Sequence, residues 1–212
     1  MASVQMPSLS TRRPSHSRTR LSVVKEKLLS DNYISDRWNL LDLECSLSGI
    51  LPNFLMGEDC QLLSAVRNEA LRGDTFDRPL ASSKEWNEWK DMEHRALLTQ
   101  AGALTLRHQD SHGFSTWITF QEGRIRIGWM SCPTQHELRA WMADPVGYTG
   151  GPLRYVVLVP GQTIFIPSGV VHFVFRLIGR NLLTFALGGH VLSWSSLDLG
   201  MEVILDQLAH LT

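Results

Sequence analysis

Apolar residues in the first half of the chain recur at intervals of three and four positions, the spacing that places them on one face of a helix. The last of these segments begins with Ser82 and Glu85, the spacing of a capping box. The helical spacing covers three segments: 20–30, 58–73 and 82–98. The pattern predicts a helical layer over residues 21–100.

The pattern changes after Gly102. From there, short segments rich in β-branched and aromatic residues are separated by turns that contain Gly or Pro, which predicts β-strands. Helical spacing returns at 134–142, which has the capping pair Thr134 and Glu137, and at 195–211. The pattern favours a mainly β fold, a barrel or sandwich with a helical N-terminal buttress. The predicted strands are 103–108, 114–120, 124–130, 154–159, 163–167, 170–177 and 181–187.

Composition adds a boundary near the start of the chain. The 212 residues provide one domain with a sizeable core, and 43% of them are hydrophobic, as in globular proteins. The first twenty carry four arginines and no acid and are rich in Ser and Pro, so a flexible basic tail is expected. The sequence therefore divides into four parts: the tail at 1–20, a helical region at 21–100, a β core at 101–192 and a C-terminal helix at 193–212.

Several function classes receive no support. The net charge of −1 does not argue for nucleic acid, and the basic tail is expected to be solvated rather than a transit peptide or a nucleic-acid contact. No apolar run has the length of a membrane span, and the tail lacks the apolar region of a secretory signal. Cys45, Cys60 and Cys132 are far apart and form no CxxC pair, so free thiols in a reducing compartment are expected. These features predict a cytoplasmic or nuclear protein.

Candidate chemistry is concentrated in the β-rich half. His108 and Asp110 lie two positions apart, and residues i and i+2 of a strand point to the same face. His172, just after the Ser168-Gly169 turn, is the best third candidate. Two histidines and one carboxylate form the facial triad of non-haem Fe(II) oxygenases, which leaves three coordination positions open. We therefore expect these three side chains to bind a metal and to carry catalysis.

The alternative for each of these residues is an ordinary role in the core, because His-x-Asp triplets are frequent by chance. The strand context of all three favours the metal hypothesis. The remaining histidines are expected in surface or structural roles, although His112 lies in the loop after the ligand pair and could touch substrate. These histidines are His16, His94, His112, His136, His190 and His210.

Three segments together resemble the JmjC/cupin-like oxygenases, in particular small stand-alone JmjC proteins of filamentous fungi: "TLRHQDSHGFSTWITFQEGRIRIGW", "YVVLVPGQTIFIPSGVVHFVFRL" and "TFALGGHVL". The resemblance covers roughly residues 85–193. It implies a double-stranded β-helix, a jelly-roll barrel that holds Fe(II) and 2-oxoglutarate at one end. Such enzymes hydroxylate or oxidatively demethylate their substrates.

The resemblance also implies where 2-oxoglutarate would bind. Family members pair its distal carboxylate with a lysine after the Gly turn and with a hydroxyl that Thr105 would supply here. This chain has no lysine there. Arg126 and Arg124 could hold the carboxylate instead, since an arginine can form a bidentate pair. On a plain half-buried strand, however, both would face solvent while Ile125 and Ile127 line the core.

Two further positions remain open for the co-substrate. Arg176 and Arg180 follow the distal histidine, where related oxygenases outside the JmjC family anchor 2-oxoglutarate. Thr184 could offer a hydroxyl near the iron, or it could pack in the core.

Three functions follow from these residues. The first is an Fe(II)- and 2-oxoglutarate-dependent dioxygenase acting on a small molecule or a protein side chain. The missing lysine motivates the second, a cupin-type isomerase or oxygenase that does not use 2-oxoglutarate. The third is a JmjC-like binding module whose site has decayed.

No membrane contact is expected, and the apolar segment 197–211 would suit either a homodimer through terminal helices or a helix folded back on its own domain.

Overall fold

The structure is a computed structural model. It describes residues 2–6, 15–29, 37–45, 47, 50–71, 82, 92–177 and 183–209.

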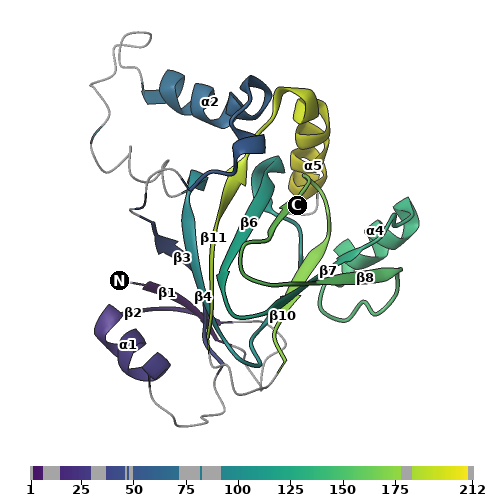
Figure 1. Ribbon diagram of the computed structural model, residues 1–212. Coiled ribbons are helices and arrows are strands. Elements are labelled where there is room, and N and C mark those ends of the chain that lie inside the picture. The colour runs from purple at the N-terminus through teal and green to yellow at the C-terminus, as the bar shows by residue number, and fades with distance from the viewer. Residues whose placement is uncertain are drawn as a thin grey trace.

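Two antiparallel β-sheets form the centre of the molecule (Figure 1). In spatial order, the larger sheet contains β2 (Ser15–Thr19), β1 (Ala2–Met6), β3 (Asn39–Glu44), β4 (Arg95–Gln100), β11 (Leu183–Val191), β6 (Ser115–Glu122) and β9 (Thr163–Ile166). The smaller sheet contains β5 (Leu104–His108), β10 (His172–Phe175), β7 (Ile125–Met130) and β8 (Leu153–Leu158). No described strand pairs with a strand of the other sheet, so the arrangement is an open sandwich and not a closed barrel.

The main core lies between the two sheets. Strand alternation directs every second side chain inward. In β7, Ile125 and Ile127 are buried, Arg126 between them is half-buried, and Arg124 just before the strand is exposed. The buried members of this core are Ile118, Phe120, Ile125, Ile127, Leu158, Ile166 and Ala186.

The other face of the larger sheet is also covered. Trp117, with no exposed surface, and Leu187 pack against Cys45 and Leu55 of the N-terminal region. The covering elements include the short 3-10 helices η1 (Asn53–Leu55) and η2 (Glu58–Gln61), with α2 (Leu62–Leu71) following directly. Because both of its faces are buried, β11 is protected along most of its length.

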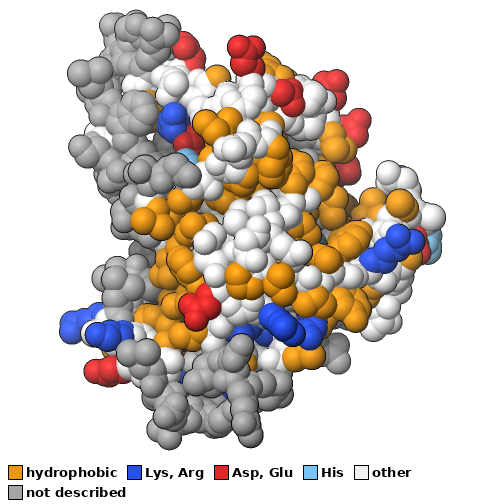
Figure 2. Space-filling view, in the orientation of Figure 1, with side chains coloured by type: hydrophobic (Ala, Val, Ile, Leu, Met, Phe, Trp, Pro, Cys, Tyr) orange, Lys and Arg blue, Asp and Glu red, His pale blue; other side chains and the backbone are white. Residues whose placement is uncertain are grey.

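Three more helices lie at the periphery. α1 (Leu21–Leu29) packs Val24 and Leu28 against Leu40 of β3. α4 (Gln135–Ala143) begins with the expected capping box, and α5 (Leu197–Ala209) lies where the sequence predicts a closing helix. Hydrophobic side chains extend across the middle of the face in Figure 2. On α5, the exposed ones are Leu197, Leu199, Met201, Leu205 and Leu208. None of the described helices has the length and hydropathy to cross a membrane.

The N-terminal part differs from the sequence expectation. The segment expected as a flexible tail contains the strand pair β1–β2, and the region expected to be helical supplies β3 and β4 to the larger sheet. The alternation of β4 was hidden because both faces of this strand are covered, so apolar residues occur on each side. The capping residue Glu85 and most of the helix predicted at 82–98 lie outside the described residues.

Candidate metal centre

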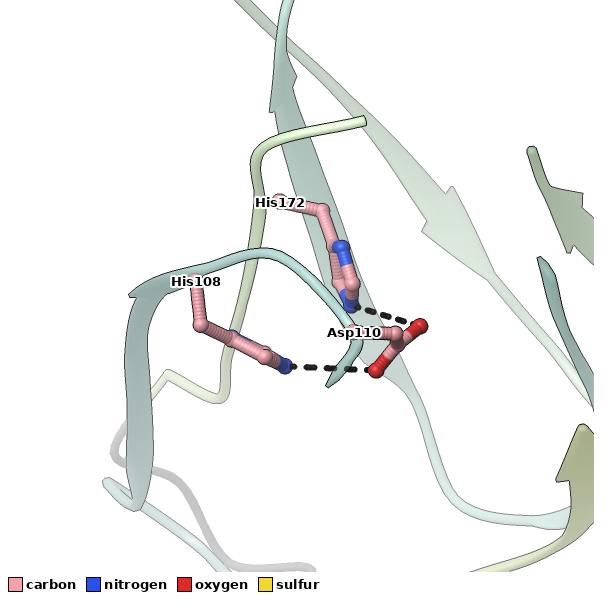
Figure 3. A group of neighbouring side chains, drawn as sticks. All are labelled: His108, Asp110 and His172. Carbon is pink, nitrogen blue, oxygen red and sulfur yellow. Dashed lines mark ion pairs between the residues drawn. The ribbon is translucent and has the colours of Figure 1, made fainter. Parts of the chain in front are cut away.

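Three side chains from two distant parts of the chain converge at one end of the sandwich (Figure 3). His108 ends β5 and His172 begins β10, and the antiparallel register places the two residues directly opposite each other. Asp110 follows in the loop after β5. The ligand atoms of these three side chains all lie within 4.8 Å of one another. The structure therefore brings together all three residues predicted to bind a metal.

The carboxylate of Asp110 faces both imidazoles. His108 Nε2 is 4.0 Å from Asp110 Oδ1, and His172 Nε2 is 4.0 Å from Asp110 Oδ2. The ring centroids of the two histidines are 4.2 Å apart. Figure 3 shows that one ring nitrogen of each histidine, the Nε2 atom, points toward the carboxylate. A single cation between them can contact one donor atom from each residue.

Backbone contacts prepare both imidazoles as ligands. The Nδ1 atom of His108 lies 2.9 Å from the carbonyl of Leu106, and that of His172 lies 3.0 Å from the carbonyl of Val170. A carbonyl can only accept a hydrogen bond, so each Nδ1 carries the proton and each Nε2 keeps a lone pair for a metal. This pattern is typical of histidine ligands oriented by a second partner.

Burial favours the neutral form of His172. Desolvation lowers the pKa of His172 below the ordinary value, and the nearby His108 lowers the pKa further, while Asp110 and the Val170 carbonyl oppose the shift. A neutral imidazole is the form that binds a metal. His172 is therefore prepared as a ligand at neutral pH.

The loop that carries Asp110 is held by α5. Gln207 of α5 donates to the carbonyl of Asp110 over 3.0 Å and accepts from the backbone N–H of His112 over 3.3 Å. Gly113, in the left-handed region with φ +66°, packs directly on α5, because a Cβ there would lie 2.4 Å from the carbonyl oxygen of Gly200. This helix contact was not predicted from the sequence, although "DSHG" is typical of a tight turn.

A second polar chain reaches Asp110 from the larger sheet. Thr116 Oγ1 is 2.5 Å from Asp110 Oδ2 and 2.8 Å from His190 Nδ1. Sequence reasoning assigned His190 an ordinary role. Its place in "TFALGGHVL", a segment that carries the family resemblance, was the available signal.

The triad opens into a cavity of about 320 Å³ between the two sheets. Arginine, hydroxyl and imidazole groups join the three candidate ligands in its wall. Among the lining residues are Arg95, Leu97, Thr105, Thr116 and His190. A neighbouring cavity of about 330 Å³ also reaches His172 and has an almost wholly apolar wall. It is lined by Ile127, Trp129, Ile164, Phe165, Ile166, Pro167 and Val170.

The predicted co-substrate residues have different positions. Thr105 lines the cavity of the triad, and its hydroxyl accepts from Asn39 over 2.7 Å. Thr184 is buried, with 2% of its surface exposed, and is not part of that wall. Arg124 and Arg126 are also outside the wall, because Ile125 and Ile127 take the inward positions of β7.

Arg176, the first of the two candidate arginines after the distal histidine, does not line the cavity of the triad. Arg176 is buried, and its guanidinium donates to the backbone carbonyls of Thr99 and Leu183. Burial lowers the pKa of Arg176 to about 10. Two of its N–H groups therefore have structural partners. Arg180 lies outside the described residues.

No family model matches the chain. Solved structures with partial similarity include peruvianin-I, a cysteine peptidase from Thevetia peruviana latex (18% identity, TM-score 0.34, covering 47% of this chain and 49% of that chain). Another is the Drosophila melanogaster CENP-C cupin domain (10% identity, TM-score 0.34, covering 46% of this chain and 59% of that chain). A third is the Lactobacillus farciminis oxalate decarboxylase (14% identity, TM-score 0.32, covering 48% of this chain and 23% of that chain). The chain thus spans about half the length of the first of these structures. Similarities at this level assign no family.

Proposed function

We propose that the protein is a non-haem Fe(II) oxygenase built on a JmjC/cupin-like double-stranded β-helix. Strand order supports the fold assignment. Strands β4 to β11 are divided between two four-stranded groups, β4-β11-β6-β9 and β5-β10-β7-β8, with antiparallel pairing throughout. Two facing antiparallel sheets of four strands each are the architecture of a jelly roll.

The convergence of His108, Asp110 and His172 is the observation that carries the functional proposal. Two imidazoles and one carboxylate suit a first-row divalent metal, and this donor set with open positions is typical of Fe(II) oxygenases. When bound, Fe(II) would supply the activation of molecular oxygen. His108, Asp110 and His172 would hold the ion in the wall of the cavity, and the cavity would place a substrate beside it.

The use of 2-oxoglutarate requires a cationic partner for its distal carboxylate. Arg124 and Arg126 do not fit this role, but Arg95 of β4 lines the same cavity as the triad. Leu97 packs into the inter-sheet core and Ala96 packs on the opposite face, so strand alternation directs Arg95 inward. Gly188 lies beside Arg95 in the neighbouring strand and also lines this cavity. We propose that Arg95 and Thr105 hold the co-substrate.

A second candidate function follows from the outward position of Arg126. A cupin-type metalloenzyme that uses the triad without 2-oxoglutarate needs no such partner, and in that case Arg95 would contact an acidic substrate. The third hypothesis, a binding module with a decayed site, has less support because both imidazoles retain the orientation of a ligand.

The apolar cavity next to His172 supports a proposal about the part of the substrate that reacts. Its isoleucine, tryptophan and phenylalanine side chains favour an aliphatic or aromatic group, whether this belongs to a small molecule or to a protein side chain. We propose hydroxylation at a C–H bond of that group.

Anaerobic calorimetry tests the proposal. Wild-type protein should bind one Fe(II), and His108→Ala or Asp110→Ala should raise the Kd at least about 100-fold, since each removes a direct ligand. His136→Ala, on the exposed side of α4, is the control. Iron binding that survives both ligand substitutions would overturn the proposal.

Binding of 2-oxoglutarate to the iron-loaded protein then distinguishes between the two candidate enzyme functions. With Fe(II) loaded under anaerobic conditions, 2-oxoglutarate should bind, and once molecular oxygen is admitted it should be converted to succinate and carbon dioxide. Arg95→Ala should weaken its binding by about 10- to 100-fold, the value of a lost charge-assisted hydrogen bond. Iron binding without any 2-oxoglutarate binding would instead support the second candidate.

A further inference from the structure

Thr116 lies between Asp110, a candidate metal ligand, and His190, a histidine outside the triad. It lies on β6 directly opposite His190 of β11, and its hydroxyl is within hydrogen-bond distance of both Asp110 and His190. Neither Thr116 nor His190 belongs to the triad, but both line its cavity. The geometry points to a role for this pair in orienting the metal-binding carboxylate.

The direction of each hydrogen bond follows from the chemistry of the three groups. A carboxylate only accepts, so the single hydroxyl proton of Thr116 must be donated to Asp110 Oδ2. Thr116 can then only accept from His190, which requires a proton on the Nδ1 atom of His190. Donation therefore runs from His190 through Thr116 to Asp110.

The imidazole of His190 is held in the orientation that this chain of bonds requires. Its ring stacks on Phe114, with centroids 4.9 Å apart and planes inclined by 18°. The preceding Gly189 allows β11 to approach the neighbouring backbone, because a Cβ there would lie 1.7 Å from the carbonyl oxygen of Glu93. These two contacts explain the presence of Phe114 in the "GFSTW" segment and of Gly189 in the "GGH" segment.

We propose that Thr116 and His190 are positioning residues for the metal. Thr116 occupies Oδ2 and fixes the rotation of the Asp110 carboxylate, which leaves Oδ1 as the single donor to the ion. His190 polarises the Thr116 hydroxyl and thereby strengthens its bond to Asp110. A one-donor carboxylate is what keeps three positions open in a facial triad. The inference rests on the proposed function, since it assumes that Asp110 binds the ion.

Metal titrations of matched variants test the assignment. Thr116→Val preserves shape and removes the hydroxyl, and we expect it to raise the Kd for Fe(II) or Co(II) by about 10- to 100-fold, the usual effect of losing a partner of a ligand. Thr116→Ser retains the hydroxyl and should stay within about 3-fold of wild type. His190→Phe retains a ring for stacking and should raise the Kd by about 3- to 10-fold, and His190→Asn, which restores an N–H donor, should recover most of this loss.

The double variant separates positioning from general structural damage. If His190 acts through Thr116, Thr116→Val/His190→Phe should bind metal no more weakly than Thr116→Val alone. The Co(II) absorption spectrum should change in Thr116→Val, because a freely rotating carboxylate can offer both oxygens, and should be restored in Thr116→Ser. Nitrogen NMR of the metal-free protein should show the Nδ1-protonated form for His190.

The outcomes distinguish this inference from the proposed function. Unchanged metal affinity and Co(II) spectrum in Thr116→Val, or additive losses in the double variant, would overturn the positioning role and leave the oxygenase proposal intact. A wild-type protein that binds no divalent ion would overturn both.

Discussion

The two ends of strand β6 use similar turns with opposite results. Before β6, the loop at 109–114 includes Gly113 with φ +66° and directs the Asp110 side chain into the cavity. After β6, the turn at Gly123, with φ +82°, leads into a strand whose arginines lie outside that cavity. A charged residue next to a glycine turn therefore says little by itself about where its side chain points.

The difference comes from what fixes each segment. On β7, the burial of Ile125 and Ile127 decides which way the side chains between and beside them point, because successive residues of a strand face opposite sides. Asp110 lies in a loop where no such alternation applies, and three contacts set its position: Gln207 of α5, Thr116 of β6 and the packing of Gly113 on Gly200. The metal centre thus depends on tertiary contacts, and the β7 arginines depend on the pattern of one strand.

A glycine series gives the largest expected effects on this comparison. Gly113→Ala should destabilise the protein by about 2–4 kcal/mol, because it adds the cost of a left-handed alanine to a clash with the backbone of Gly200. It should also raise the Kd for metal about 10-fold by displacing Asp110. Chemical denaturation and metal calorimetry measure the two effects.

Two other glycines provide matched controls for that change. Gly123→Ala should cost about 2–3 kcal/mol, since its Cβ would lie 2.7 Å from the carbonyl oxygen of Leu183, but should leave metal affinity within about 2-fold. Gly161→Ala has a similar positive φ and open space around it, so it should cost about 1–2 kcal/mol and no metal affinity. Equal metal affinities for the Gly113 and Gly123 variants would remove the distinction between the two loops.

The sequence carried the information for much of the β core and for the three candidate ligands. His108 and His172 could be predicted because strand and turn signals surround both, and the structure places them on paired strands. Strands β3 and β4 could not, because the larger sheet is covered on both faces there and these strands lack simple alternation.

The polar environment of the site was much less accessible to sequence reasoning. Arg95 and His190 reach the cavity through pairings between strands far apart in the chain, which no local pattern encodes. The sequence is compatible with either Ile125 or Arg126 facing inward, and only the packed core decides between them.

Acid sensitivity should reveal the burial of His172, with a smaller effect. Its pKa is lowered in the folded protein, so the unfolded chain binds more protons as the pH falls below about 6.5, the ordinary histidine value. Stability of the metal-free protein should therefore fall as the pH decreases from about 6.5 toward the lowered pKa, with this residue contributing at most about 1.4 kcal/mol per pH unit.

Denaturation of wild-type and His172→Gln protein between pH 5 and pH 7, in the presence of a chelator, measures that slope. The slope should be shallower in His172→Gln, and His136→Gln on the exposed side of α4 is the control. If stability depends on pH equally in wild-type and His172→Gln protein, the imidazole of His172 is solvated. That result would contradict the buried position of His172 on the paired strands β5 and β10.

The smallest effect is expected at Arg126 of β7 and at Arg124 just before it, because the sequence alone is compatible with either an inward or an outward position for these side chains. Because Ile125 and Ile127 occupy the inward positions, Arg124→Ala and Arg126→Ala should each change the free energy of unfolding by no more than about 0.5 kcal/mol. They should also leave Fe(II) and 2-oxoglutarate binding within about 2-fold of wild type, in contrast to Arg95→Ala, since neither side chain borders the cavity of the triad. Calorimetry on the iron-loaded variants is the measurement. A large loss of 2-oxoglutarate binding in Arg126→Ala alone would mean that β7 turns this residue inward when the co-substrate binds, and that strand alternation in the core does not decide where the carboxylate is held.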